Sequence, residues 1–322
     1  MDQLRFFRKA SFSPGEIGRV RQFLRPSGTT MLLPYDQFIE HDCRHLEAES
    51  DAGNPDYIME LGQDGGFNAV AVHYGLAKRF WSKTEGRIPA IIKVNGKTSF
   101  PRDDEALSTH TSWVEEAVRL GAVGIGYTMY YGSPRQDQDL PQLAAVRKEC
   151  DRFGMPLIVW AYPRGSAINA KGGRDTSYAL ESAARLAMEM GSTIIKSNLP
   201  KAAKDDFVSN EKVPKYYRSL EKELKALPSH EQKSERARRV VFAAQGVPVL
   251  FSGGDDKTDA ELMENAEVCA KAGCFGFIYG RNMWKRKKEN AVALAHKLVA
   301  MLDESVEQPA FAGGNNKGGV LV

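Results

Sequence analysis

The chain has 322 residues, of which 42% are apolar and 26% are charged, so it can bury a large core and is not expected to be disordered. Its 44 basic and 41 acidic residues leave a formal charge of +3, which does not predict binding to nucleic acid or to a membrane surface. The four cysteines form no Cys-x-x-Cys pair, and no stretch is apolar enough for a secretory signal or a membrane span. These features predict a reduced, cytoplasmic protein.

Eight short apolar runs follow one another along the chain, and most of them are rich in Val and Ile. Such runs are typical of strands that are buried on both faces, as in a parallel sheet. The runs are 29–36, 67–75, 89–96, 122–132, 155–163, 192–200, 247–254 and 274–282.

Helical patterns lie between most of these runs. In 139–153 the apolar residues recur at steps of three and four, which predicts an amphipathic helix. Thr258 and Glu261 have the spacing of a capping box, which predicts the start of a further helix. A glycine before a strand suits the left-handed turn that ends the preceding helix. Such glycines are Gly121, Gly154, Gly191, Gly246 and Gly273.

Eight alternations of strand and helix, without a break in composition, predict a single α/β domain over 1–322 that forms a (β/α)₈ TIM barrel at about 29–300. An open doubly wound sheet is the alternative, weakened because no Gly-x-Gly-x-x-Gly follows the first run. An N-terminal extension precedes the barrel, and the charged segment 201–235 is expected to add helix after the sixth strand. The glycine-rich tail, 304–322, is expected to be either a frayed end or a flap over a site or a neighbouring subunit.

Active sites of TIM barrels lie at the carboxyl ends of the strands. Polar or aromatic side chains follow all eight runs here, and buried polar groups cost free energy unless they are paired. We therefore expect an active site at this end of the barrel. The residues concerned include Asp36, His73, Lys93, Asn95, Tyr130, Trp160, Tyr162, Arg164, Lys196, Asn198, Ser252, Gly253, Gly254, Gly280 and Arg281.

Lys196 is the strongest candidate for a nucleophile, because it follows Thr-Ile-Ile in a run that should be buried. Burial lowers the pKa of a lysine, and the neutral amine can attack a carbonyl group to form a Schiff base. The alternative is a lysine paired with a carboxylate inside the barrel mouth. Lys93 is a similar candidate, and the alternative is that it serves as a charge partner.

The ends of the seventh and eighth runs suggest a phosphate site. The backbone N–H groups of Ser252, Gly253 and Gly254 can approach an anion closely, and Arg281 after Gly280 can bind a phosphate in a bidentate manner. Ordinary glycine turns are the alternative.

Two further residues can move protons. Asp36 can hold or deprotonate a hydroxyl group, and the phenol of Tyr162 can have its pKa lowered beside a cationic iminium. The alternatives are a salt-bridged aspartate and a core tyrosine. Trp160 is expected to form a wall of the pocket.

A metal site is the alternative to a lysine-dependent site. His41, Cys43, His45 and His73 could supply zinc ligands, but their spacing matches no standard short zinc motif. We therefore expect no metal and no other cofactor.

Five motifs resemble those of the archaeal-type class I fructose-bisphosphate aldolases. Each motif lies at one expected strand end, and the motifs follow one another in the same order as in that family. The resemblance covers most of the chain, from the first predicted strand to the eighth. The motifs are Pro34-Tyr-Asp36-Gln-Phe-Ile-Glu40-His41, Val159-Trp160-Ala-Tyr162-Pro-Arg164-Gly165, Ile194-Ile-Lys196, Phe251-Ser252-Gly253-Gly254 and Tyr279-Gly280-Arg281-Asn282.

The resemblance implies a role for each matching residue. The Schiff-base lysine falls on Lys196, the acid–base tyrosine on Tyr162 with Trp160 beside it, and the strand-one aspartate on Asp36. The main phosphate site falls on Ser252, Gly253, Gly254, Gly280 and Arg281, and the second phosphate falls on His41 and Arg164.

It also implies a sugar bisphosphate substrate, a place in glycolysis and gluconeogenesis, and a homo-oligomer, often a decamer. The chain departs from the family at Phe38, where many members have Gly, and in 201–235 and the tail. Three rivals remain: a related lysine-dependent aldolase or transferase for another keto-phosphate, a metal-dependent aldolase, and a phosphometabolite-binding barrel with an inert Lys196.

Overall fold

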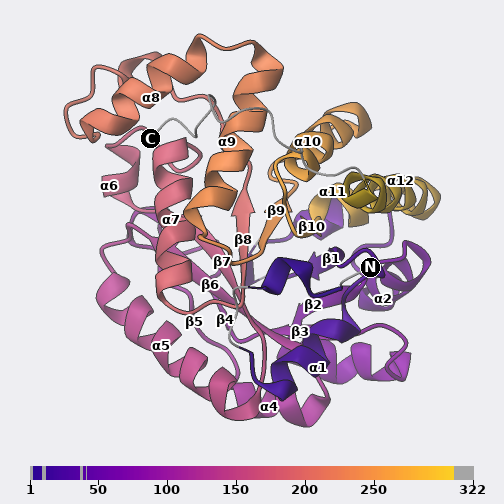
Figure 1. Ribbon diagram of the computed structural model, residues 1–322. Helices are drawn as coiled ribbons and strands as arrows, with labels where there is room; N and C mark the ends of the chain where they lie inside the picture. The colour runs from indigo at the N-terminus through magenta and orange to yellow at the C-terminus, as the bar shows by residue number, and fades with distance from the viewer. Residues whose placement is uncertain (1–2, 9–11, 37–38, 41, 308–322) are drawn as a thin grey trace.

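The computed structural model describes residues 3–8, 12–36, 39–40 and 42–307. Within them, eight parallel strands pair in the order β1-β2-β3-β6-β7-β8-β9-β10, and β10 pairs with β1 to close a barrel (Figure 1). The predicted (β/α)₈ fold is therefore confirmed, and each predicted run contains one strand of the barrel. The strands are β1 Thr30–Tyr35, β2 Ala69–His73, β3 Ala90–Lys93, β6 Gly124–Tyr131, β7 Leu157–Pro163, β8 Ile194–Asn198, β9 Val249–Ser252 and β10 Gly276–Ile278.

Helices surround the barrel in Figure 1, and their ends agree with the sequence signals. Thr258 and Glu261 form the predicted capping box, and the five glycines expected to end helices all have positive φ. The helices are α1 Pro14–Gln22, α2 Pro55–Asp64, α3 Tyr74–Arg79, α4 Val114–Leu120, α5 Gln136–Phe153, α6 Ser166–Asn169, α7 Ser177–Glu189, α8 Lys215–Lys225, α9 Ser229–Ala243, α10 Asp259–Lys271, α11 Arg281–Trp284 and α12 Lys288–Glu307.

Two features differ from the expectation or add to it. A small antiparallel pair, β4 Asn95–Gly96 and β5 Thr109–His110, lies in the connection after β3. Helix α12 continues to Glu307, so residues 304–307 of the expected tail are helical, and 308–322 lie outside the described residues. The predictions for the tail and for the number of domains stay predictions.

The N-terminal segment packs against the interior of the barrel. Phe7, Val20 and Phe23 are buried in one apolar cluster with strand residues such as Ile91. Arg19 of α1 donates to the carbonyl oxygen of Gly154 at 2.8 Å, and this glycine precedes β7. The segment therefore covers the amino-terminal end of the barrel, and the carboxyl ends of the strands are left for the site.

The charged segment after β8 is held by two buried ion pairs. Arg236 of α9 pairs with Glu221 of α8 at 2.8 Å, with both side chains 2% exposed. Arg239 of α9 pairs with Glu181 of α7 at 2.9 Å. Glu221 also accepts a hydrogen bond from the backbone N–H of Ala203, which belongs to the loop after β8. The predicted extra helix is confirmed, and these bonds tie it to the loop that follows Lys196.

We predict that Glu221→Ala lowers the free energy of unfolding by about 3–5 kcal/mol, because it leaves the charge of Arg236 buried without a carboxylate partner. Chemical denaturation of the full chain measures this difference. Asp205→Ala is the control, since Asp205 forms an exposed pair with Lys225 that is worth about 1 kcal/mol or less. Equal effects of the two substitutions would contradict the prediction.

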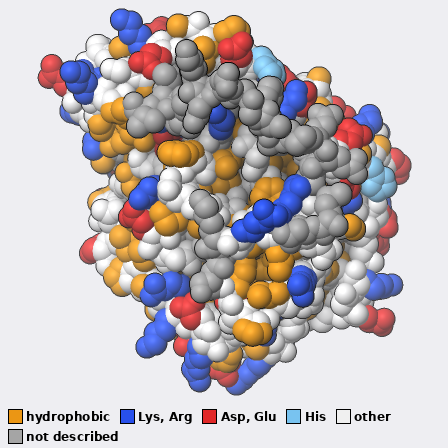
Figure 2. Space-filling view, in the orientation of Figure 1, with side chains coloured by type: hydrophobic (Ala, Val, Ile, Leu, Met, Phe, Trp, Pro, Cys, Tyr) orange, Lys and Arg blue, Asp and Glu red, His pale blue; other side chains and the backbone are white. Residues whose placement is uncertain are grey.

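The surface agrees with the balanced composition. On the face shown in Figure 2, basic and acidic side chains are interspersed around the edge. In the parts of the chain that are described, no helix has both the length and the apolar character required to cross a bilayer.

Candidate active site

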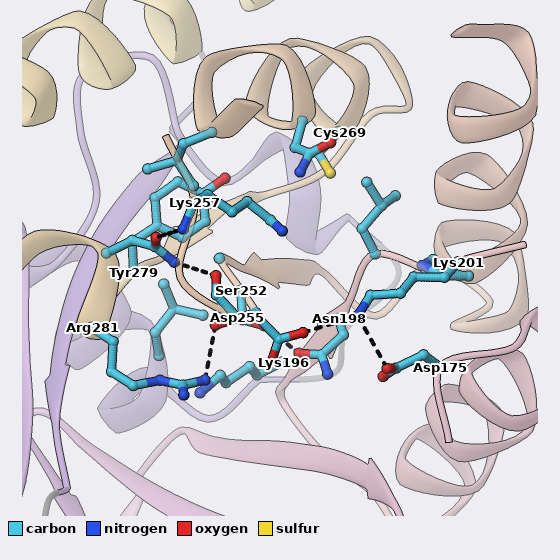
Figure 3. Close-up of a pocket in the computed structure, with 18 of the residues that line it drawn as sticks. Asp175, Lys196, Asn198, Lys201, Ser252, Asp255, Lys257, Cys269, Tyr279 and Arg281 are labelled. Carbon is cyan, nitrogen blue, oxygen red and sulfur yellow. Dashed lines mark hydrogen bonds and ion pairs between the residues drawn. The ribbon is translucent and has the colours of Figure 1, made fainter. Parts of the chain in front are cut away.

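The residues singled out from the sequence meet at the carboxyl ends of the strands. Asp36 follows β1, Tyr162 lies near the end of β7, and Lys196 lies on β8, in register with Trp160 of β7. Asp36, Tyr162 and Lys196 line one pocket of about 430 Å³, part of which is shown in Figure 3. The barrel topology therefore brings together side chains that are up to 160 positions apart in the sequence, at the place where this fold carries its chemistry.

Lys196 is buried, with 4% of its surface exposed. Its ammonium nitrogen lies 5.0 Å from the ring centre of Trp160 and 5.3 Å from that of Tyr162. Burial, assisted by the positive charges of Lys93 and Arg281, lowers the pKa of Lys196 to about 7, although Asp36 and Glu40 act in the opposite direction. A substantial fraction of Lys196 is therefore neutral near pH 7, as a nucleophilic amine requires.

Lys93 has the opposite character, although it is also buried. Its ammonium group binds Thr128 at 2.7 Å, Glu40 at 3.0 Å and Asp36 at 3.5 Å. Burial alone would lower the pKa of Lys93, but Glu40 and Asp36 raise it above its ordinary value. Of the two candidate lysines, Lys93 is therefore the paired and charged one, and Lys196 is the one suited to nucleophilic attack.

The ammonium groups of Lys93 and Lys196 both lie near the indole ring of Trp160. The Lys93 ammonium lies 4.8 Å from the ring centre of Trp160, and Lys196 lies at a similar distance. Gly126 of β6 makes room for this arrangement, because a Cβ there would lie 2.7 Å from Lys93 Cδ and 2.8 Å from the Trp160 ring. The Trp160 ring therefore lies close to both the charged lysine and the candidate nucleophile, although Trp160 is not among the residues that line the pocket.

Tyr162 faces Lys196 from the neighbouring strand. Burial, with the charges of Asp36 and Glu40, raises the pKa of Tyr162 in the unliganded site. The phenol is therefore protonated at neutral pH and can act as a proton donor. The lowering of this pKa that the sequence suggested requires an iminium group beside it, so it is not tested by the unliganded site.

The loops that follow β9 and β10 are joined by hydrogen bonds. We call the residues at this edge of the pocket the cradle: Ser252, Gly253, Gly254, Gly280 and Arg281. Arg281 donates to the carbonyl oxygen of Gly254 at 2.9 Å, and Asn282 donates to that of Asp255 at 3.1 Å. The side-chain oxygen of Asn282 accepts the backbone N–H of Lys257 at 2.9 Å. Gly254 has φ +70°, a conformation that favours glycine. These bonds fix two short loops around one edge of the pocket.

Glycine is also required at the two other cradle positions by close neighbours. A Cβ on Gly253 would lie 2.6 Å from the side-chain nitrogen of Asn282, and one on Gly280 would lie 2.7 Å from the carbonyl oxygen of Pro34. Ser252, at the end of β9, donates a short hydrogen bond to Asn198 of β8, which also lines the pocket. The cradle therefore directly adjoins the strand that carries Lys196.

The expected contacts for a second phosphate are described only in part. Arg164 lines the pocket, with its guanidinium 5.3 Å from the ring centre of Tyr162 and one nitrogen bonded to the carbonyl oxygen of Pro163. His41 and Phe38 lie outside the described residues. The proposed role of His41 therefore stays a prediction.

The histidines of the metal hypothesis lie in different settings. His45 is buried, Cys43 is exposed, and burial, with Lys93, lowers the pKa of His73 to about 3. Among the described residues, no group of three or more His, Cys, Asp and Glu side chains could hold a metal ion. His41 is not among those residues, so the hypothesis is left to experiment.

Sequence reasoning missed two contributors to the site. Glu40 lies in the motif 34–41 but was not predicted to take part in the site, although it pairs with Lys93 and Thr128. Lys201, in the loop after β8, lines the pocket and pairs with carboxylates of two other loops (Figure 3). Nothing in the local sequence distinguished Lys201 from the other lysines of 201–235. The position of Glu40 four residues after Asp36, next to an expected strand end, was the signal available.

Comparison with known proteins places this geometry in a family. The family model described as "DeoC/LacD family aldolase" matches residues 30–286. A relative from Thermoproteus tenax, named "Fructose-bisphosphate aldolase class 1", is 31% identical over 85% of this chain and 90% of its own length. A relative from Archaeoglobus fulgidus, named "2-amino-3,7-dideoxy-D-threo-hept-6-ulosonate synthase 1", is 26% identical over 93% of this chain and 97% of its own.

Solved structures agree with these relatives. An archaeal fructose-1,6-bisphosphate aldolase, with its catalytic lysine covalently bound to the carbinolamine intermediate of the substrate, is similar with 30% identity and a TM-score of 0.72. The match covers 90% of this chain and 99% of that one. The family that was inferred from five motifs is thus supported by matches along most of the sequence. The chain belongs to the DeoC/LacD family of aldolases.

Proposed function

We propose that the protein is a class I aldolase that cleaves fructose 1,6-bisphosphate into dihydroxyacetone phosphate and glyceraldehyde 3-phosphate. The observation that carries the proposal is the setting of Lys196. This buried lysine has a pKa lowered to about 7, faces Trp160 and Tyr162, and shares its pocket with the Gly253–Gly254–Arg281 cradle. An amine nucleophile beside an anion-binding edge suits a phosphorylated ketone. The names of the Thermoproteus tenax relative and of the archaeal structure support this substrate.

The reaction begins with the neutral amine of Lys196, which attacks the C2 carbonyl carbon of the open-chain sugar. Loss of water from the carbinolamine gives an iminium ion that can accept an electron pair. Removal of the C4 hydroxyl proton then breaks the C3–C4 bond, releases glyceraldehyde 3-phosphate and leaves an enamine on Lys196. Protonation of C3 and hydrolysis of the iminium release dihydroxyacetone phosphate and regenerate the amine.

Three surrounding residues are proposed to assist Lys196 by proton transfer, by orientation of the substrate and by packing. Tyr162, protonated in the free site, supplies the proton to C3 of the enamine. Asp36, whose negative charge is stabilised by Lys93 at 3.5 Å, orients the C4 hydroxyl group or helps to move its proton. Trp160 packs its ring close to both lysines and helps to hold them in place.

Two regions are proposed to bind the phosphates. The backbone N–H groups of Ser252, Gly253, Gly254 and Gly280, together with Arg281, bind the phosphate nearest to Lys196. Arg164, on the side of Tyr162, binds the second phosphate together with His41.

The strongest rival is a related lysine-dependent reaction on another keto-phosphate. The Archaeoglobus fulgidus relative supports it, because this relative, at 26% identity, is named for a different activity. Cleavage rates for a panel of ketose phosphates and bisphosphates, measured by release of the aldehyde product, test the choice of substrate. The proposal expects the highest kcat/KM for fructose 1,6-bisphosphate. A higher value for another keto-phosphate would favour the rival, and binding without any turnover would favour an inert barrel.

We predict that the rate of imine formation, trapped with borohydride, rises with pH and levels off above about pH 7. The pKa of Lys196 is about 7, so the neutral fraction grows roughly tenfold per pH unit below that value and changes little above it. An ordinary lysine, with a pKa of about 10.4, would instead keep gaining rate up to about pH 10. A continued rise between about pH 8 and pH 10 would contradict the lowered pKa.

The setting of the enzyme is also proposed from the family. We infer that it is cytoplasmic, acts in glycolysis and gluconeogenesis, and assembles into a homo-oligomer such as a decamer. Light scattering on the purified full chain measures the assembly directly, and a monomer at working concentration would contradict that part of the proposal.

A further inference from the structure

Lys201 lies in the loop after β8, five residues beyond Lys196, and its backbone is firmly held. Its N–H donates to the carbonyl oxygen of Asp175 at 2.8 Å. Two residues further, the N–H of Ala203 donates to Glu221, whose carboxylate also forms the buried pair with Arg236. The added helix α8 therefore fixes the place from which the Lys201 side chain extends into the pocket.

The side chain of Lys201, in contrast, is held by contacts that are easily exchanged. Its ammonium group lies 3.0 Å from Asp255 and 3.4 Å from Asp175 (Figure 3). Lys201 and Asp255 are 57% and 68% exposed, and pairs of this kind contribute about 1 kcal/mol or less. A ligand with a higher negative charge in the same place can therefore displace the carboxylates.

Asp255 directly follows Gly254 of the cradle, so Lys201 reaches the edge at which a phosphate is proposed to bind. Arg281 already uses one guanidinium nitrogen to hold the carbonyl oxygen of Gly254. The carboxylate of Asp255 would repel a phosphate dianion at this edge, and Lys201 neutralises it. A lysine that left Asp255 for the phosphate would add a charge-assisted hydrogen bond to the backbone donors of the cradle.

We propose that Lys201 is a substrate-binding residue that moves from Asp255 and Asp175 to the phosphate of the ketose when that phosphate enters the cradle. The inference deepens the proposed function and rests on it, because it assumes a phosphate beside the carbonyl that Lys196 attacks. Lys201 thereby selects phosphorylated ketones, and the added helix α8 positions it through Ala203.

The test compares two small ketones that differ by one phosphate. Dihydroxyacetone phosphate and dihydroxyacetone are each titrated into the full-length protein, and the borohydride-trapped adduct on Lys196 is quantified. Lys201→Met raises the half-saturating concentration of dihydroxyacetone phosphate about tenfold, as expected for loss of one charged hydrogen bond, and leaves that of dihydroxyacetone unchanged. The control is Lys204→Met, an exposed lysine three residues further along the same loop, which changes neither value. Equal effects of Lys201→Met on both ketones would overturn the proposal.

A double variant separates direct contact from mere neutralisation of Asp255. If Lys201 binds the phosphate, Lys201→Met still raises the half-saturating concentration of dihydroxyacetone phosphate when Asp255→Asn has already removed the repelling carboxylate, so the double variant binds more weakly than Asp255→Asn alone. If Lys201 only cancels the charge of Asp255, the double variant returns to the wild-type half-saturating concentration, and the proposal is wrong. Asp255→Asn alone is expected to bind the phosphorylated ketone at least as tightly as the wild type, because Lys201 no longer has to leave a carboxylate.

Failure of the proposed function gives a different pattern. A wild-type protein that forms no adduct with either ketone contradicts the Schiff-base function itself. Calorimetric titration with inorganic phosphate then still tests Lys201, since the cradle does not depend on imine chemistry. Weaker phosphate binding by Lys201→Met, with Lys204→Met unchanged, supports the contact, and equal binding by both variants and the wild type overturns it.

Discussion

Lys196→Met is expected to abolish the covalent adduct and to lower kcat for fructose 1,6-bisphosphate by about 10⁴-fold or more. Removing a catalytic nucleophile costs on the order of 10⁶-fold in well-characterised enzymes, and among the described lysines only Lys196 has a pKa lowered by burial. Lys93 is the nearest alternative, but Glu40 and Asp36 raise its pKa and keep it protonated. Methionine retains a long apolar side chain against the ring of Trp160, so the variant should fold.

The measurement combines steady-state kinetics with mass spectrometry of borohydride-treated protein. Circular dichroism and thermal unfolding give the control for folding, and Lys204→Met gives the control for loss of one positive charge in the chain. A trapped adduct on Lys93 in the Lys196→Met variant, or turnover near the wild-type rate, would show that Lys196 is not the nucleophile.

Tyr162→Phe is expected to lower kcat by about 10²–10⁴-fold, the usual contribution of a positioned proton donor. The substitution removes the phenol whose pKa is raised in the free site but keeps the ring that faces Lys196. The amine remains intact, so the Schiff base should still form. Loss of turnover with retention of the adduct is therefore the distinctive result.

Rapid-quench trapping of the adduct, together with kcat, separates these two steps. Tyr131→Phe is the matched control, because Tyr131 lies at the end of the neighbouring strand β6. Near-normal kcat in Tyr162→Phe would contradict its role in proton transfer. Loss of both the adduct and turnover would instead assign Tyr162 to the formation of the imine.

The barrel could be predicted from the sequence because its determinants are local. Strands buried on both faces give continuous apolar runs, and Gly154 and Gly191 mark the left-handed ends of the preceding helices. The pair β4 and β5 could not be predicted in this way, because two-residue strands carry no periodic pattern. The packing of Phe7 and Phe23 into the barrel depends on contacts across the whole chain and has no local signature.

The candidate site could be predicted to the level of residues but not of roles. Topology places Lys93 and Lys196 at the same end of the barrel, so both were candidates for the nucleophile. What distinguishes them is the 3.0 Å contact between Lys93 and Glu40, which are 53 positions apart in the sequence. The role of Lys201 similarly depends on Asp255, which follows it by 54 positions. Pairings of this kind are set by the fold and not by local spacing.

The most direct test of the central claim is to mix the protein with fructose 1,6-bisphosphate and EDTA, add borohydride, and map the adduct by peptide mass spectrometry. A mass derived from dihydroxyacetone phosphate on Lys196 is the predicted result, and it would establish a Schiff base that forms without a metal ion. A folded protein that gives no adduct, or an adduct on another lysine, would contradict the account and return attention to the metal-dependent and binding-only alternatives.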